Sequence, residues 1–167
     1  MGDFQYRFLD RWHVPADPGL TWDVLGEALL YPEWWRSFCL RAEGDAGPPA
    51  PGRRVRLLVR GFLPYRVCLE MECLEAERPR RLASRVGGDL VGTGTWTLEP
   101  APGGGTDATL DWRPAVSRPL LRGLTPVARP LLRSNHTWAM RRGQREIVPW
   151  VADPDGVHRA IAATRSG

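Results

Sequence analysis

Polar residues that could carry out chemistry gather in one stretch near the end of the chain. They are Asn135, His136, Trp138, Arg141 and Arg142, within about two turns of a predicted helix. Imidazole titrates near neutral pH, so His136 is the best candidate for proton transfer, with Asp10 or Glu33 as an assisting carboxylate. No spacing fixes a second catalytic group, so the catalytic residues stay unknown. The alternative is a histidine on the helix flank that hydrogen-bonds to the sheet or to water.

Asp10 lies on the apolar side of an alternating pattern that runs from Phe4 to Val14. A buried carboxylate needs a partner, so Asp10 is either a site residue or a strand-edge residue that reaches water.

Metal and nucleotide chemistry find no support in the motifs. His13, His136 and His158 have no metal-ligand spacing, and the chain has no HExxH, CxxC or GxSxG pattern and no phosphate-cradling glycine loop. We therefore expect neither a metal nor a cofactor.

The charge is basic but diffuse. The chain has 167 residues, a formal charge of +4 and 23 basic residues, all of them arginine. They are spread from Arg7 to Arg165 and often alternate with apolar residues, whereas a nucleic-acid site needs a clustered patch with aromatic residues for stacking. The pattern predicts a solvated outer face and no nucleic-acid binding.

Length and composition predict one globular domain. The hydrophobic share is 43% and no apolar run approaches the ~18 residues of a membrane span, so we expect no membrane insertion. The N-terminus is too charged for a secretory signal, and Cys39, Cys68 and Cys73 form no CxxC pair. These features predict a cytoplasmic protein with reduced thiols.

The stretch with the polar residues belongs to a long amphipathic helix. Its apolar stripe predicts a helix from Thr125 to about Val148, with a short turn over Leu120–Leu124 before it. A turn at Asp153–Gly156 and a short helix or frayed tail should follow.

Before this helix, apolar residues recur at every second position, which is the period of a strand. A strand over Phe4–Val14 precedes a helix that starts at Pro18 and reaches about Leu30, and then the tract Tyr31-Pro32-Glu33-Trp34-Trp35. About six short strands follow between Phe38 and Pro114. One apolar sheet face and one long apolar helix predict an α+β domain in which the helix covers the sheet. Gly92 and Gly94 on the inward face bend their strand or leave space against the helix.

Several local motifs resemble the START-like, or SRPBCC, superfamily of helix-grip proteins, within it the polyketide cyclase/dehydrase-like group. The motifs are the entry Trp12-His13-Val14-Pro15-Ala16-Asp17-Pro18, Trp22 and Val24, the YPEWW tract and Gly92-Thr93-Gly94-Thr95-Trp96. The resemblance implies a curved antiparallel sheet of about seven strands around a long C-terminal helix, with two short helices after the first strand. It also implies a domain over residues 1–152, followed by a tail over 153–167 that is a short helix or disordered.

Eight tryptophans and the inward glycines suit a flat hydrophobic or aromatic ligand. Strand parity and helical spacing predict the ligand-binding residues, and Trp34 or Trp35 should lie at the entrance. The predicted set is Trp12, Trp34, Trp35, Tyr65, Val67, Trp96, Trp112, Asn135, Trp138 and Arg142.

Three functions remain open. The first is binding of a hydrophobic, lipid-like or aromatic small molecule in a cavity between sheet and helix. The second is a cyclase/aromatase-type enzyme with cyclase- or dehydratase-like activity, and the third is a module with a filled interior that binds a protein partner or forms a homodimer. The fold does not decide among them.

Overall fold

The computed structural model describes residues 7–115 and 125–166. Its strands are β1 Phe8–Val14, β2 Cys39–Gly44, β3 Arg54–Arg60, β4 Arg66–Glu77, β5 Arg81–Gly88, β6 Val91–Pro100 and β7 Thr106–Ala115. Its helices are α1 Pro18–Gly26, the 3₁₀ turn η1 Ala28–Leu30, α2 Tyr31–Trp34, α4 Thr125–Val151 and α5 Pro154–Arg165. The expected strand residues Phe4–Tyr6 and the expected turn at Leu120–Leu124 lie outside the described residues.

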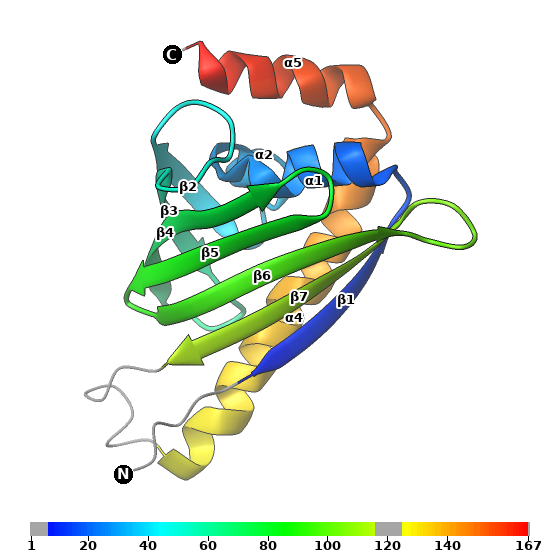
Figure 1. Ribbon diagram of the computed structural model, residues 1–167. Helices are drawn as coiled ribbons and strands as arrows, with labels where there is room; N and C mark the ends of the chain where they lie inside the picture. The colour runs from blue at the N-terminus through cyan, green and yellow to red at the C-terminus, as the bar shows by residue number, and fades with distance from the viewer. Residues whose placement is uncertain (1–6, 116–124, 167) are drawn as a thin grey trace.

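The seven strands form one antiparallel sheet in the order β1-β7-β6-β5-β4-β3-β2. The sheet curves around α4, while α1 and α2 close one end of the interior (Figure 1). This arrangement confirms the predicted helix-grip fold, in which one long helix covers the apolar face of a curved sheet.

Strand β3 shows how the alternating sequence produces this arrangement. Val55, Leu57 and Val59 are at most 5% exposed, whereas Arg54 and Arg56 point outward into solvent. Because side chains on a strand alternate between faces, one segment supplies both the core and the charged surface.

The helical segment after β1 is interrupted, where the sequence predicted one helix up to about Leu30. The Asp17 side chain caps the first turn of α1 by accepting a 3.0 Å hydrogen bond from the Leu20 N–H, as expected for an N-cap. Glu27 then adopts non-helical dihedrals (φ −91°, ψ 78°) that end α1 and start η1. This change of direction sends Glu27 into the interior, where it is fully buried.

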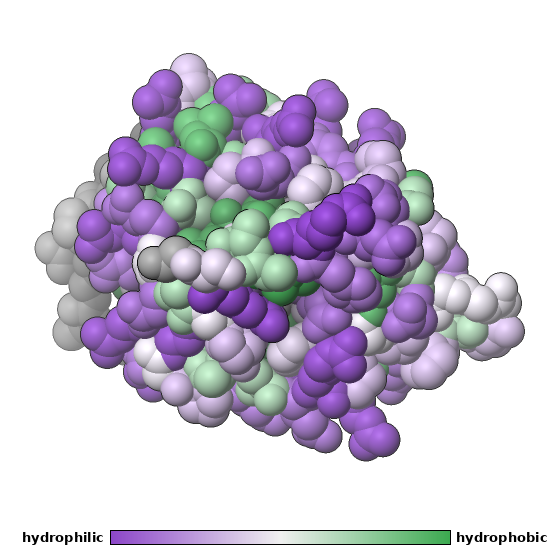
Figure 2. Space-filling view, turned by 90° about the horizontal axis from the view of Figure 1, so that it is seen from above, coloured by the Kyte–Doolittle hydropathy of each residue, from purple (hydrophilic) through white to green (hydrophobic). Residues whose placement is uncertain are grey.

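The segment expected to be a turn at Asp153–Gly156 is instead the start of α5. The Asp153 side chain accepts a 3.0 Å hydrogen bond from the Gly156 N–H, and Pro154 occupies the first turn, where its missing N–H costs nothing. Val157 and Ile161 of α5 are buried in the same core as the sheet. Seen from the α5 end, most of the surface is hydrophilic, with smaller hydrophobic areas between (Figure 2).

Among the described helices, none has the length and apolar character needed to cross a bilayer.

Candidate functional site

An inner cavity of about 180 Å³ lies between the sheet and α4. Most of its wall is apolar, and the aromatic part of the wall comes from Tyr31, Trp35, Phe38, Trp96 and Trp112. The polar side chains on the wall are Arg53, Cys73, Ser84, Tyr31 and His136. The cavity therefore combines an apolar interior with a few polar groups, which is the usual composition of a small-molecule site.

One row of residues crosses the sheet beneath this cavity. Direct cross-strand neighbours in the row run Phe8, Trp112, Gly94, Ser84 and Cys73, from β1 to β4. Gly94 stands in the middle of the row, between Trp112 on one side and Ser84 on the other, and it lines the cavity without a side chain of its own. An added Cβ at Gly94 would lie 3.3 Å from the Trp112 ring. The predicted role of Gly94 in leaving space against the helix agrees with its position on the cavity wall.

Gly92, the other inward glycine, has a different role. An added Cβ there would overlap the backbone of β7 at Arg113 and Pro114, so Gly92 permits close strand approach.

Trp34 and Trp35 are both buried, where the sequence predicted one of them at the entrance. They are 3% and 5% exposed and their rings stack at 5.3 Å. The prediction assumed a helix through both residues, but α2 ends at Trp34 and Trp35 takes non-helical dihedrals (φ −105°, ψ 52°). Both rings can therefore turn inward. The indole N–H of Trp35 donates to the Ala139 carbonyl of α4 at 3.2 Å.

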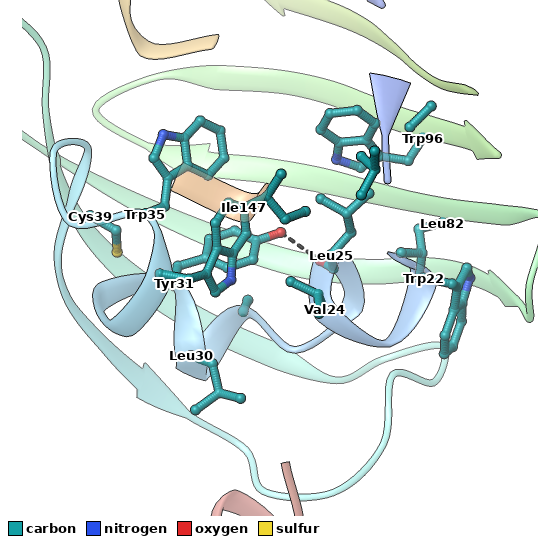
Figure 3. Close-up of a cluster of buried hydrophobic side chains, with 14 of the residues drawn as sticks. Trp22, Val24, Leu25, Leu30, Tyr31, Trp35, Cys39, Leu82, Trp96 and Ile147 are labelled. Atoms are coloured by element: carbon teal, nitrogen blue, oxygen red, sulfur yellow. Dashed lines mark hydrogen bonds between the residues drawn. The ribbon is translucent and has the colours of Figure 1, made fainter. Parts of the chain in front are cut away.

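Trp12 packs behind the cavity wall. Its ring lies 5.5 Å from that of Trp35 and 5.0 Å from that of Trp96, forming an aromatic cluster beneath α4. Figure 3 shows Trp35 and Trp96 in this buried cluster, with Tyr31, whose hydroxyl donates to the Leu25 carbonyl at 2.6 Å. Burial raises the pKa of Tyr31 well above its ordinary value.

Glycine lets α4 approach this cluster closely. A Cβ at Gly143 would lie 2.6 Å from ring atoms of both Trp12 and Trp35. Gly143 therefore brings the helix backbone against the two rings, at the cost of about 1 kcal/mol in helix propensity.

A buried ion pair stands at one end of the cavity, and sequence reasoning missed it. Arg53 donates to the Glu27 carboxylate at 2.6 Å, and their side chains are only 7% and 1% exposed. Arg53 lines the cavity, and its carbonyl accepts a 2.8 Å hydrogen bond from the Cys73 N–H. One Glu27 oxygen, Oε2, is buried and has no partner among the described residues. The sequence feature that could have indicated this pair is the acidic residue Glu27 within the apolar stripe of the predicted helix.

Ser84 was also not predicted. It faces Cys73 across β4 and β5, and the Cys73 N–H in turn donates to the Arg53 carbonyl. The Ser84 hydroxyl lines the cavity and makes no hydrogen bond to another described residue. Burial raises the pKa of the Cys73 thiol, so this end of the cavity holds a guanidinium, a hydroxyl and a protonated thiol.

His136 reaches the cavity from α4 at the opposite end of the row. Its Nε2 lies 2.6 Å from an Asp10 carboxylate oxygen, and its ring stacks on Phe8 at 4.2 Å. The side chains of His136 and Asp10 are 16% and 21% exposed. The structure therefore brings together the two residues that the sequence named as candidates for proton transfer. Glu33, the other carboxylate considered, lies on the exposed side of α2.

Four of the predicted ligand-binding residues lie elsewhere. Tyr65, Trp138 and Arg142 line an open outer pocket beside the β3–β4 hairpin, and Tyr65 is 42% exposed. The prediction for Tyr65 relied on the alternation of side chains along a strand, but β4 begins only at Arg66, so Tyr65 lies outside the strand. The side-chain oxygen of Asn135 accepts a 3.1 Å hydrogen bond from the Phe62 N–H, so Asn135 holds this hairpin against α4.

The ten predicted residues therefore divide by location. Trp35, Trp96 and Trp112 line the inner cavity. Trp12 and Trp34 are buried in the surrounding core, and the half-buried Val67 packs against it. A role of any of them in ligand binding stays a prediction.

No group of three histidine, cysteine or acidic residues within 7–115 and 125–166 is arranged to hold a metal ion.

Sequence and structure comparisons agree with this architecture. The sequence model of the family described as "Polyketide cyclase / dehydrase and lipid transport" matches residues 7–148. No curated protein sequence matches the chain significantly.

Three solved structures illustrate the range of similar proteins. The ZhuI aromatase/cyclase of Streptomyces sp. R1128 has a TM-score of 0.72 and 18% identity, covering 89% of this chain and 94% of its own. A START superfamily protein of Mycobacterium smegmatis has a TM-score of 0.66 and 12% identity, covering 89% and 97%. The major latex-like protein 151 of Panax ginseng has a TM-score of 0.63 and 8% identity, covering 86% and 95%. At these identities the likeness shows the shared fold alone.

Proposed function

Since the chain belongs to the polyketide cyclase/dehydrase and lipid transport family, we propose that the inner cavity binds a compact hydrophobic or aromatic small molecule. The observation that carries this proposal is the cavity of about 180 Å³ between Trp35, Trp96 and Trp112. An interior without such a space would favour a protein-partner module. An apolar cavity of about 150 Å³ is enough to hold benzene, whereas drug-sized ligands occupy about 300 Å³ or more. The ligand is therefore a small ring system.

The polar groups on the wall set the orientation of this ligand. Arg53 and Ser84 supply N–H and O–H donors at one end, next to the protonated thiol of Cys73. A ligand with a phenol or carbonyl oxygen would place that oxygen toward Arg53 and its ring over Gly94, against Trp112. Arg53 is preorganised for this contact because its pairing with Glu27 fixes the guanidinium.

A titration with 1-naphthol, followed by quenching of tryptophan fluorescence, tests this proposal. Gly94→Leu would fill the space over the sheet and should weaken 1-naphthol binding at least tenfold, with an overpacking cost of about 1 to 3 kcal/mol. Gly103→Leu is the matched control, because an added Cβ there meets no atom within 4 Å. Thermal melts show that both variants are folded. Unchanged binding in folded Gly94→Leu would reject the inner cavity as the site.

The His136–Asp10 pair favours a second candidate, a cyclase/aromatase-type enzyme. A histidine on the cavity wall with a carboxylate at 2.6 Å has the arrangement of an oriented general base. Neutral His136 would take a proton from the carbon next to a ketone, and the enolate that results is the nucleophile of an aldol ring closure. This function uses the same cavity.

Deuterium exchange separates the two candidates. A base at His136 should speed exchange of the C2 protons of 1-tetralone in D2O, measured by NMR under saturating protein. His136→Gln should abolish this acceleration and leave 1-naphthol binding within about twofold. Binding without any acceleration by the wild-type protein would leave ligand binding as the function and reject the enzyme.

A further inference from the structure

The outer pocket is a second site, separate from the inner cavity and independent of the function proposed for it. It is an open hollow of about 600 Å³ between the β3–β4 hairpin, the start of β2 and α4. Its lining residues are Ser37, Arg60, Gly61, Phe62, Leu63, Pro64, Tyr65, Arg66, Trp138 and Arg142. Three of these are arginines and none is acidic.

The charge pattern along β3 and β4 changes at this pocket. Arg54 stands opposite Glu72 and Arg56 opposite Glu70, with N–O distances of 3.7 and 3.1 Å. At the hairpin end of the same two strands, Arg60 stands directly opposite Arg66. Like charges directly opposite on a sheet are destabilising, so this pair lowers stability where an arginine–glutamate pair would raise it.

The three arginines of the pocket form no salt bridge with a described carboxylate, although Glu146 accepts a 3.1 Å hydrogen bond from the N–H of the lining residue Ser37. Within the described part of the chain, no carboxylate lies within 4 Å of a guanidinium nitrogen of Arg60, Arg66 or Arg142. Arg60 Nε donates to the Ser37 carbonyl at 3.0 Å, and the Arg142 guanidinium lies 5.6 Å from the centre of the Trp138 ring. These contacts fix the positions of Arg60 and Arg142, and neither contact is with a negatively charged group.

The hairpin that bears the pocket is fixed to α4. The Asn135 side-chain oxygen accepts a hydrogen bond from the Phe62 N–H at 3.1 Å, and a Cβ at position 61 would displace the Asn135 amide. The fixed hairpin presents Phe62 and Tyr65, which are 46% and 42% exposed, beside the arginines. The pocket is thus preformed, with both cationic and aromatic walls.

We propose that the outer pocket binds a phosphate group carried on an apolar or aromatic body. Guanidinium groups match the oxygens of phosphate with paired N–H donors, and a phosphate monoester brings about −1.5 to −2 charges to three arginines without a salt bridge to a described carboxylate. The exposed rings of Phe62 and Tyr65 would contact the body of the molecule. Soluble phosphate esters and the headgroups of anionic phospholipids share this chemistry.

Calorimetric titration with phenyl phosphate tests the site, with phenol and inorganic phosphate as partial probes. Phenyl phosphate should bind more tightly than either, and its affinity should fall as salt is raised. Arg60→Gln and Arg66→Gln should each weaken binding about tenfold or more. Arg56→Gln removes an arginine that lies on the same strand as Arg60 but is paired with Glu70 of β4, and it should have no such effect. Gly94→Leu should also leave phenyl phosphate binding unchanged, since it alters the inner cavity alone.

Arg66→Glu separates binding from folding. It would complete the ladder of arginine–glutamate pairs opposite Arg60, so the melting temperature should rise by about 1 to 3 °C while phenyl phosphate binding is lost. Loss of binding in a more stable protein cannot come from unfolding.

Vesicles identify the source of the phosphate. Cosedimentation with phosphatidylcholine vesicles containing phosphatidic acid, abolished by Arg60→Gln, would assign a lipid headgroup. Phenyl phosphate binding without cosedimentation would assign a soluble ester. The proposal would be overturned if neither phenyl phosphate nor the vesicles with phosphatidic acid bound to the wild type. It would also be overturned if Arg60→Gln and Arg66→Gln bound phenyl phosphate as tightly as the wild type.

Discussion

His136 and Asp10, which are 126 positions apart in the chain, meet with Nε2 and a carboxylate oxygen 2.6 Å apart. The contact joins α4 to β1 across the interior, and the His136 ring stacks on Phe8 of the same strand. It is both a tie between the helix and the first strand and the polar end of the cavity wall opposite Arg53.

The first prediction concerns the stability of this pair. Both side chains are mostly buried, so removing one leaves the other without its partner. Asp10→Asn and His136→Gln should each lower the free energy of unfolding at pH 7 by about 1 to 3 kcal/mol, measured by urea denaturation. The double variant should cost less than the sum of the two. Strict additivity would mean that the two residues do not interact in solution.

Replacing Gly143 by alanine should lower the stability of the protein, whereas this change in a helix usually raises it. Glycine to alanine normally stabilises a helix interior by about 1 kcal/mol. Here the new methyl group would lie 2.6 Å from the rings of Trp12 and Trp35, so Gly143→Ala should destabilise the protein by about 1 to 3 kcal/mol in urea denaturation.

Ser134→Ala, on the exposed side of α4, is the control and should be neutral or slightly stabilising. A Gly143→Ala protein as stable as the control would contradict the close packing of the helix on the two tryptophans.

The three cysteines should differ in their rates of alkylation. Burial raises the pKa of the Cys39 thiol to about 12 and raises that of Cys73, so both thiols stay protonated and unreactive at higher pH than usual. Cys68 is exposed. At pH 8 iodoacetamide should therefore modify Cys68 first, as measured by peptide mass spectrometry.

Occupation of the inner cavity should change only one of these rates. Because Cys73 lines the cavity, 1-naphthol should slow its alkylation further and leave Cys68 unaffected. Protection of Cys68 instead would place the bound molecule on the outer face of the sheet.

Asp111 predicts a pH dependence of stability. Hydrogen bonds from Arg113 and then from Arg7 hold its pKa far below the ordinary value. A carboxylate whose pKa is lowered by folding contributes stability above its unfolded pKa of about 4 and loses it as the pH falls below that value. The difference in unfolding free energy between wild type and Asp111→Asn should therefore be smaller at pH 3 than at pH 7.

Arg113→Gln checks the cause of this effect. It removes the main hydrogen-bond donor, so the pH dependence should be weaker than in the wild type. If the difference in unfolding free energy between wild type and Asp111→Asn were larger at pH 3 than at pH 7, the hydrogen bonds from Arg113 and Arg7 would not be the cause.

The sequence by itself determined the elements that rest on local periodicity. The period-two alternation in segments such as Arg54–Arg60 and the apolar stripe of α4 depend only on neighbours along the chain, so they predicted the sheet, the long helix and the inward position of Gly94. Side-chain direction inside a regular strand followed from the same parity, which placed Trp96 and Trp112 on the cavity side.

The tertiary structure alone decided what depends on element ends and on pairing between distant segments. Trp35 and Tyr65 lie just outside regular elements, where periodicity no longer sets direction, so Trp35 turned inward and Tyr65 outward. The Arg53–Glu27 pair, the His136–Asp10 contact and the opposition of Arg60 to Arg66 arise from strand register and helix placement. These distances are set by the packing of the whole core, which no local pattern records.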